Sequence, residues 1–325
     1  MIERALVVIA LAACGGTQSG APAKSAYDPA PVVIAGAFPT DRGPDGNSII
    51  LRAPRGLIVV DTGRHTEHQE KLLAFARQAG APIAAIVNTH WHLDHSGGNA
   101  ELRAVYPGAE LIATRAVEGA LVGFFPKGRA QGEALLASGK ATPQQIEDIK
   151  LGRAAIDDTA NLLPSRPIAQ SGPVDIAGRR LDLRVAPFAA TEADLWIYDP
   201  ATKTAIVGDL VVAEVPFFDS GCPEGWRAAL GEIAATPFDR LIPGHGEPMT
   251  REAFAQWRAA FNALLDCAAS QAEAATCVAG WRTGAAAFIP AGDEARIDEY
   301  TTYYLTEILR SPKAHERFCH PLRAE

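Results

Sequence analysis

Imidazole and carboxylate side chains are concentrated in one short segment, which reads Asn88-Thr89-His90-Trp91-His92-Leu93-Asp94-His95-Ser96-Gly97-Gly98-Asn99. Three of the eight histidines in the chain fall within six of these residues. In an extended stretch, side chains two apart point the same way, so His90 and His92 can hold one ion together. Asp94 and His95 are adjacent and diverge, and they can therefore serve a second ion. Ligands of these two kinds, at this density, favour zinc or iron over calcium.

The elements around this segment must position it. The segment directly follows an apolar strand predicted at residues 83–87, and its glycines allow a sharp turn into the next helix. Short β-branched runs between Gly, Pro and Asp predict further strands at 32–35, 48–52, 57–60, 111–112, 174–176, 179–185, 195–198, 204–207 and near 241. Helical spacing of apolar residues predicts helices at 66–79, 97–104, 115–122, 223–234 and from 251 to the end. Residues 127–163 are rich in Ala, Gln and Glu, and predict a helical insertion over the site.

The composition of the chain indicates a globular protein that does not bind nucleic acid. The chain has 325 residues, of which 48% are hydrophobic and 21% charged, as is usual for a globular protein. Its formal net charge is -8, and no run of Lys or Arg exceeds two residues. A nucleic acid partner is therefore not expected. The recurrence of strands and helices in two similar halves indicates sheets covered by helices.

The first thirty residues are predicted to direct export. A short apolar run from Ala5 to Ala13 suits a signal peptide better than a membrane-spanning helix. It ends in Leu11-Ala12-Ala13-Cys14, which resembles the lipobox of bacterial lipoproteins. We expect cleavage after residue 13, lipidation of Cys14, and a flexible tether over residues 14–30. The protein would then lie in the periplasm, anchored by lipid to a bacterial membrane, by preference the outer one. The alternative is a frayed helix with an incidental cysteine.

The other cysteines are consistent with an oxidising compartment. Cys222, Cys267, Cys277 and Cys319 are an even number and allow three pairings. We favour Cys267 with Cys277, because they are close in sequence, and Cys222 with Cys319. Buried thiols are the alternative, and a role of Cys222 in binding metal is a weaker one.

Four motifs in order resemble those of the metallo-β-lactamase superfamily, from about Pro31 to Thr250. Besides the histidine segment, Leu57-Ile58-Val59-Val60-Asp61-Thr62-Gly63 resembles the superfamily's strand that ends in Asp-Thr-Gly. Ile206-Val207-Gly208-Asp209-Leu210 resembles its Gly-Asp motif, and Ile242-Pro243-Gly244-His245-Gly246 its closing motif. Residues 205–248 look most like periplasmic zinc metallohydrolases associated with quinoproteins. The resemblance implies a four-layer αβ/βα sandwich over residues 31–250, followed by a helical extension over residues 251–325.

The resemblance also implies a role for each matched residue. His90 and His92 would hold the first metal, and Asp94, His95 and His245 the second. Asp209 would bridge the two. Asp61 would orient the ligand loop through hydrogen bonds, although a carboxylate that only caps a turn is an equal alternative. The expected cofactor is one or two zinc ions, with iron or manganese as alternatives.

One position departs from the superfamily's pattern. A third histidine is expected for the first metal, and Ala190 stands in its place. The second position could then bind metal alone, or Glu192, His65 or His68 could complete the first. Two further alternatives are a protein that binds metal or ligand without turnover, and redox chemistry with iron.

The expected activity is hydrolysis of an ester, thioester or lactam-like carbonyl in a small molecule. Zinc lowers the pKa of a bound water to about 7, which supplies hydroxide to attack the carbonyl carbon. The metal would offset charge on the oxygen. Asp94 or Asp209, whichever is less committed to metal, would orient the water and shuttle its proton. Trp91, Phe217 and Phe218 either wall an apolar pocket or belong to the core.

Overall fold

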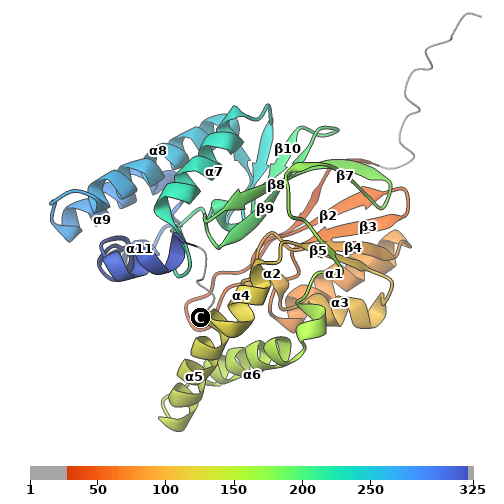
Figure 1. The fold of residues 1–325 in the computed structure, drawn as a ribbon, viewed down its shortest axis with the longest axis horizontal. Coiled ribbons are helices and arrows are strands. Elements are labelled where there is room, and N and C mark those ends of the chain that lie inside the picture. Colours follow the sequence, from red (N-terminus) through yellow and green to blue (C-terminus); the bar gives the residue numbers. More distant parts are fainter. Residues whose placement is uncertain (1–27, 321–325) are drawn as a thin grey trace, which may run out of the picture.

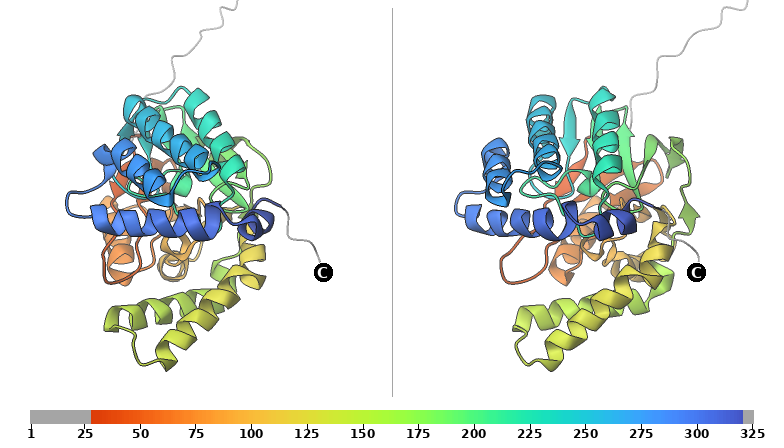
Figure 2. Two further views of the ribbon diagram at one scale, coloured as in Figure 1. Left: turned by 90° about the vertical axis from the view of Figure 1, so that its left-hand side faces the viewer. Right: turned by 60° about the vertical axis from the view of Figure 1, so that its left-hand side comes forward.

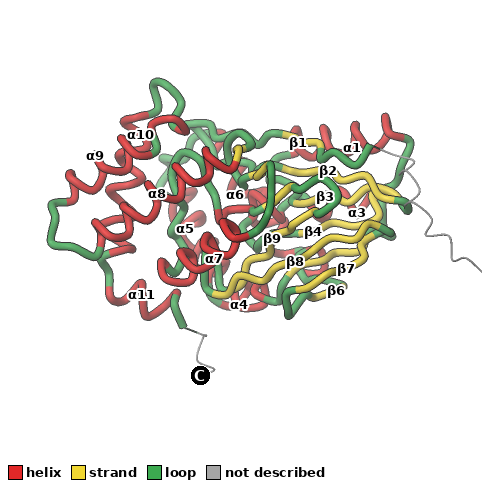
Figure 3. The backbone as a smooth tube through the Cα atoms, turned by 90° about the horizontal axis from the view of Figure 1, so that it is seen from above, coloured by secondary structure: helices red, strands yellow, loops and turns green. Residues whose placement is uncertain are grey.

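Side chains alternate between two apolar layers along each central strand, and this alternation stacks the layers of the fold. The computed structural model describes residues 28–320. In strand β2 (Ser48–Ala53), Ile49 and Leu51 face the opposite sheet, whereas Ile50 faces helices. Successive strand residues point to opposite faces, so every strand of this kind is apolar on both sides. The described residues therefore form two sheets face to face with helices outside (Figures 1 and 3), which is the predicted four-layer sandwich.

The first sheet has the strand order β1-β2-β3-β4-β5-β6. Its other members are β1 (Val32–Ile34), β3 (Gly56–Val60), β4 (Ile83–Val87), β5 (Glu110–Ala113) and β6 (Arg166–Pro167). The strands from β1 to β3 pair antiparallel, and those from β3 to β6 pair parallel. The parallel strands β3 and β4 consequently end at the same edge, where Asp61 and the histidine segment begin.

The second sheet has the order β12-β11-β10-β9-β8-β7. Its strands are β7 (Gly172–Ile176), β8 (Arg179–Pro187), β9 (Ala193–Asp199), β10 (Thr204–Ile206), β11 (Arg240–Ile242) and β12 (Met249–Thr250). Only β10 and β11 pair parallel in this sheet, so these two also end side by side. The sequence analysis did not predict β6 or β12, which are two residues long and carry no periodicity.

Helices cover the outer face of each sheet (Figure 1). On the first sheet, α1 (Thr66–Ala79) and α3 (Asn99–Val105) bury Leu72 and Leu102. Helix α1 ends where predicted, because Gly80 adopts a left-handed conformation with φ 61° and accommodates the turn. On the second sheet, α7 (Pro223–Ala235) and α8 (Arg251–Ala268) bury Trp226 and Trp257.

Three further helices follow α8, up to the end of the described chain: α9 (Ala274–Gly284), α10 (Glu294–Tyr303) and α11 (Pro312–Phe318). Short helical turns lie at η1 (Thr159–Asn161), η2 (Gly208–Leu210), η3 (Ala286–Phe288) and η4 (Tyr304–Leu309). No helix among residues 28–320 is long and apolar enough to cross a membrane.

The insertion forms a pair of helices that projects away from the sandwich (Figure 2). Helix α4 (Ala116–Val122) leads into α5 (Phe124–Ala137), and α6 (Pro143–Asp157) returns. The first helix of the pair starts at Phe124, slightly earlier than predicted. On α6, Asp148 accepts a hydrogen bond from the backbone N–H of Gly43 (2.6 Å) and contacts Nε2 of His65 (2.8 Å). These contacts attach the insertion to the loops beside the first sheet.

Two disulfide bonds have the predicted pairing. Cys267 is bonded to Cys277, at the end of α8 and within α9, and Cys222 is bonded to Cys319. The second bond joins the start of α7 to the end of α11 across a separation of 97 residues. The C-terminal helices are therefore covalently attached to the loop that precedes α7.

Candidate metal centre

Six side chains predicted as metal ligands meet at one edge of the two sheets. His90 and His92 lie in the loop after β4, and Asp94 and His95 lie in the next short helix, α2 (Leu93–Ser96). Asp209 follows β10 within η2, and His245 follows β11. Because β4, β10 and β11 end at the same edge, residues up to 155 positions apart in sequence are brought together.

The ligands form two groups that share Asp209. Asp94, His95, Asp209 and His245 each offer one donor atom, and these atoms lie within 4.8 Å of one another. His90, His92 and Asp209 form a second such group. The structure thus brings together the two sets that the sequence assigned to two ions, with Asp209 between them.

The distances among Asp94, His95, Asp209 and His245, the ligands predicted for the second metal, suit an ion with tetrahedral coordination. Nε2 of His95 lies 3.0 Å from Oδ1 of Asp209, 3.5 Å from Oδ2 of Asp94 and 3.2 Å from Nε2 of His245. Nε2 of His245 lies 3.2 Å from Oδ2 of Asp94 and 3.4 Å from Oδ1 of Asp209. Zinc bonds of about 2.0–2.2 Å give a tetrahedron with edges of about 3.3–3.6 Å. Five edges of the observed tetrahedron therefore have nearly the length that zinc requires.

Several donor atoms in the cluster have no hydrogen-bond partner among the described residues. These are Nε2 of His90 and both carboxylate oxygens of Asp209, all three buried. Buried polar atoms are nearly always paired, because an unpaired one costs about 1–3 kcal/mol. Such a set of unpartnered lone pairs fits a bound cation.

Asp61 holds the ligand loop in place. Its carboxylate accepts hydrogen bonds from the backbone N–H of Thr89 (2.8 Å) and from the Thr89 hydroxyl (2.7 Å). It also lies 2.8 Å from Nδ1 of His95. A ligand histidine whose other ring nitrogen bonds a carboxylate is fixed in tautomer and orientation. Asp61, at φ 58°, thus contacts both the ligand loop, for which the resemblance implied this role, and the His95 ring.

Two glycines permit the close approach of backbone to ligands. A Cβ atom on Gly46 would lie 2.3 Å from the His95 ring, and one on Gly244 would lie 2.0 Å from Oδ1 of Asp209. Any side chain at either position would displace a ligand. Gly244 belongs to the closing motif, whereas Gly46 was not singled out because no motif surrounds it.

The charges of the cluster favour ionised carboxylates. Burial opposes ionisation of Asp94 and Asp209, but the nearby histidines, His95 foremost, lower the pKa of both carboxyl groups. For His90 and His92, burial is the main effect and lowers the pKa of each imidazole. For His95 and His245, burial lowers the pKa but the carboxylates, Asp209 foremost, raise it above 6.5. Because neutral imidazoles and carboxylates bind metal, His90 and His92 are ready to bind, whereas His95 and His245 release a proton on binding.

None of the three residues considered as substitutes for the missing histidine reaches the cluster. Glu192 accepts a hydrogen bond from the indole N–H of Trp91 (2.8 Å). His65 is held between Asp45 and Asp148, at 2.9 and 2.8 Å, and His68 contacts the Ser48 hydroxyl at 2.8 Å. Each side chain is already engaged by a neighbour, and the structure brings none of these three alternatives into either ligand group.

Ser220 is a site residue that the sequence analysis missed. Nε2 of His92 lies 2.9 Å from the Ser220 hydroxyl, which donates a hydrogen bond to the carbonyl oxygen of Ala190 (2.9 Å). Since that hydroxyl hydrogen is used, His92 donates from Nε2 and presents Nδ1 to the cluster. Ser220 stands in Asp219-Ser220-Gly221-Cys222, where only the cysteine attracted attention. The position next to Ala190 becomes apparent only in three dimensions.

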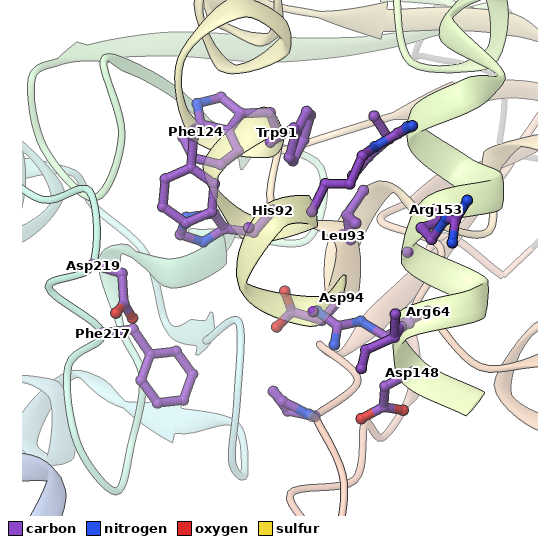
Figure 4. A pocket seen from close by; sticks show the side chains of 18 of the residues that line it. Arg64, Trp91, His92, Leu93, Asp94, Phe124, Asp148, Arg153, Phe217 and Asp219 are labelled. Atoms are coloured by element: carbon purple, nitrogen blue, oxygen red, sulfur yellow. The ribbon is translucent and has the colours of Figure 1, made fainter. Parts of the chain in front are cut away.

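A cavity of about 420 Å³ opens beside the cluster, between the sandwich and the insertion (Figure 4). His92 and Asp94 line it from the metal side, and Trp91, Phe124 and Phe217 form aromatic walls. Phe218 does not line it: this residue is fully buried and packs on Trp226 and Phe261. Of the three aromatic residues proposed as pocket walls, two line the cavity and one belongs to the core.

Comparisons with known proteins agree with this arrangement. The family model described as the metallo-beta-lactamase superfamily matches residues 41–245. Linear primary-alkylsulfatase of a Pseudomonas species is 27% identical over 227 residues, which are 62% of this chain and 41% of that protein. Hydroxyacylglutathione hydrolase of a Polaromonas species is 48% identical over 54 residues, which are 17% of this chain and 20% of that protein.

A solved structure shows the same fold over most of the chain. The stereoselective inverting sec-alkylsulfatase from a Pseudomonas species superposes with a TM-score of 0.55 and 16% identity, over 85% of this chain and 49% of that chain. The present chain spans less than half the length of the curated relatives described above.

Proposed function

Because the chain belongs to the metallo-β-lactamase superfamily, we propose that it is a metal-dependent hydrolase of an ester, thioester or lactam-like carbonyl. The observation that carries the proposal is the tetrahedron formed by Asp94, His95, Asp209 and His245, of which five edges measure 3.0 to 3.5 Å. It adjoins a cavity that is large enough for a small-molecule substrate. One of the curated relatives described above is named a hydrolase and the other an alkylsulfatase.

Asp209 and Asp94 have different roles in this proposal, one in holding metal and the other in proton transfer. Zinc held by these side chains would act as a Lewis acid and would activate water near neutral pH. Asp209 is committed to holding metal, because both of its oxygens are buried at the junction of the two groups. Asp94 lines the cavity, whereas Asp209 does not. It is therefore the carboxylate that orients a water molecule and accepts its proton.

Sulfate esters are a second candidate class of substrate. Both the relative with the longest match reported above and the superposed structure are named as alkylsulfatases. The aromatic walls of the cavity would suit an alkyl group as well as an acyl group. The rival from another class is a protein that binds metal or ligand without turnover, which the replacement of a ligand by Ala190 supports.

One experiment separates these proposals. The purified chain is loaded with zinc, iron or manganese in turn, and metal per chain is measured by mass spectrometry. Each preparation is then assayed with an aryl ester, a thioester, a chromogenic cephalosporin and an alkyl sulfate, with and without a chelator. Chelator-sensitive turnover of a carbonyl substrate supports the hydrolase. Metal binding with no turnover of any substrate supports the binding protein, and no retained metal contradicts both.

The proposed setting is the periplasm, with a lipid anchor at Cys14. That residue and the predicted signal peptide lie outside the described residues. The two disulfide bonds support the proposal, because such bonds persist mainly in oxidising compartments. Expression of the full chain in a bacterial host tests it: the wild type should sediment with membranes, and Cys14→Ser should not. Equal fractions of both proteins in the soluble extract would contradict the anchor.

A further inference from the structure

Arg64 lies at the boundary between the metal cluster and the cavity. It follows the Asp61-Thr62-Gly63 turn and lines the cavity between Asp94 and Asp148 (Figure 4). Among residues 28–320, its guanidinium donates no hydrogen bond to any side chain or carbonyl, and no carboxylate lies within 4.0 Å of it. Its Nε is buried and unpartnered. An arginine has five N–H donors, so one that uses none at the wall of a cavity is available to a ligand.

The two carboxylates that line the cavity on either side of Arg64 already have partners. Asp148 uses one oxygen to accept from Gly43 N–H and the other to contact His65. Asp94 belongs to the metal cluster. Both carboxylates line the cavity beside Arg64, and neither forms a salt bridge with its guanidinium within residues 28–320. The charge of Arg64 is consequently left for a group that enters the cavity.

A second arginine extends the same surface. Arg153, on α6 of the insertion, lines the cavity and has no salt bridge or side-chain hydrogen bond within the described part of the chain. Arg129 also lines the cavity, but its guanidinium is paired with Asp157. The cavity therefore presents two unpaired guanidiniums and one neutralised guanidinium, which provides an internal control.

Most of the remaining lining is apolar or aromatic, and its other carboxylate, Asp219, accepts a hydrogen bond from the Tyr304 hydroxyl (2.6 Å). Trp91, Phe124 and Phe217 face the cavity from the sandwich and from α5, and Ile149 and Ile156 face it from α6. An apolar body would therefore be buried against these walls. A carboxylate on that body would meet the guanidinium of Arg64 in the geometry that arginine binds best.

We propose that Arg64, with Arg153, forms a carboxylate-binding subsite, so that the substrate is an ester or thioester carrying a carboxylate on an aromatic or branched apolar body. This inference rests on the proposed hydrolase function. The carboxylate is not part of the bond that is hydrolysed: it fixes the substrate while the scissile carbonyl lies at the metal cluster.

The test uses pairs of esters that differ only in this charge. The 4-nitrophenyl monoesters of 1,3- and 1,4-phenylenediacetic acid are compared with the 4-nitrophenyl esters of 3- and 4-ethylphenylacetic acid. Each pair has one leaving group and one ring, and replaces a carboxylate by a methyl group. Both ring isomers are used because they place the carboxylate at different distances from the carbonyl. For at least one pair, kcat/KM should be tenfold or more higher for the anionic ester.

Substitutions of the cavity arginines show which of them gives the preference for the anionic ester. Arg64→Gln should remove most of this preference by raising KM for the anionic ester, about ten- to a hundredfold for a charge-assisted hydrogen bond, and should raise KM for the neutral ester far less. Arg64→Lys should keep part of the preference, and Arg153→Gln should lower it less. Arg129→Gln, which removes a guanidinium already paired with Asp157, should lower the preference least of the three. Equal kinetics for the two esters in the wild type would overturn the subsite, as would a parallel loss of both in Arg64→Gln.

An equilibrium measurement separates failure of the subsite from failure of the hydrolase. Binding of 1,3- and 1,4-phenylenediacetate to the zinc-loaded protein is measured by calorimetry, in wild type and in Arg64→Gln with equal metal content. Binding that weakens at least tenfold in Arg64→Gln supports the subsite even if no ester is hydrolysed. Hydrolysis of neutral esters with no binding of either diacid would retain the proposed function and exclude the subsite.

Discussion

Nε2 of His92 donates a hydrogen bond of 2.9 Å to the hydroxyl of Ser220, which passes its own hydrogen to the carbonyl of Ala190. The residue that replaces the expected ligand thus takes part in holding one of the ligands that remain. His92 is fixed with Nδ1 toward the cluster, so the first metal position retains His90, His92 and Asp209 in a defined arrangement.

Ser220→Ala should weaken metal binding at the first position about ten- to a hundredfold, because the partner of a ligand histidine is lost. Calorimetric titration of the metal-free protein with zinc measures this change. Ser48→Ala is the matched control: it removes a similar buried contact, of 2.8 Å, to His68, which is not a ligand. Equal loss of zinc affinity in both variants would show that Ser220 acts only on stability.

The two metal positions should differ in affinity, because one has four protein donors and the other has three. After dialysis against a mild chelator, His90→Gln should retain about the same metal per chain as the wild type. His245→Gln should retain much less, since it reduces the better position to three donors. Mass spectrometry gives the metal content of each variant. Loss of all metal from His90→Gln would mean that the first position is the stronger one.

The attachment of the insertion should depend on pH. Burial alone would lower the pKa of His65, but its bonds to Asp148 and Asp45 raise it from 6.5 to about 9. A histidine with a raised pKa stabilises the fold fully below its unfolded pKa and loses this contribution as pH rises through the folded value. The stabilisation by His65 is therefore complete below about pH 6.5 and disappears as pH rises through about 9.

Thermal unfolding of metal-free wild type and His65→Gln between pH 6 and pH 10 tests this expectation. The difference in Tm between the two proteins should be largest at pH 6 and should shrink as pH rises. His315→Gln, which changes an exposed histidine near Glu224, should give a small difference that varies little. A difference between wild type and His65→Gln that is constant with pH would refute the role of the charged imidazole.

Removal of the two disulfide bonds should cost different amounts of stability. In the chain-entropy description, a crosslink across 97 residues contributes about 5 kcal/mol and one across 10 residues about 3 kcal/mol. Cys222→Ser with Cys319→Ser should thus lower the free energy of unfolding more than Cys267→Ser with Cys277→Ser. Denaturant unfolding of both double variants decides the order, and the reverse order would contradict this account.

The fold was predictable from the sequence, and the structure brings the predicted ligands together, because local signals carry both. The central strands are short apolar runs, Gly80 ends α1, and the predicted ligands stand within dense motifs. Interactions between distant segments were not predictable in this way. Ser220 and Arg64 have ordinary neighbours in sequence, and His65 and Glu192 resembled possible ligands until their partners were visible. A polar side chain acquires its role from what the fold places beside it, and single-sequence patterns do not contain that information.

The division of the ligands between the two sheets links the stability of the native state to the supply of metal. His90, His92, Asp94 and His95 come from the first half of the chain, and Asp209 and His245 from the second. A bound ion would hold the two halves together, because each metal position takes ligands from both of them. Metal bound only by the native state favours that state by mass action. Scarcity of metal would then lower the activity of the protein and also shorten its lifetime, because molecules that had lost their ion would be degraded.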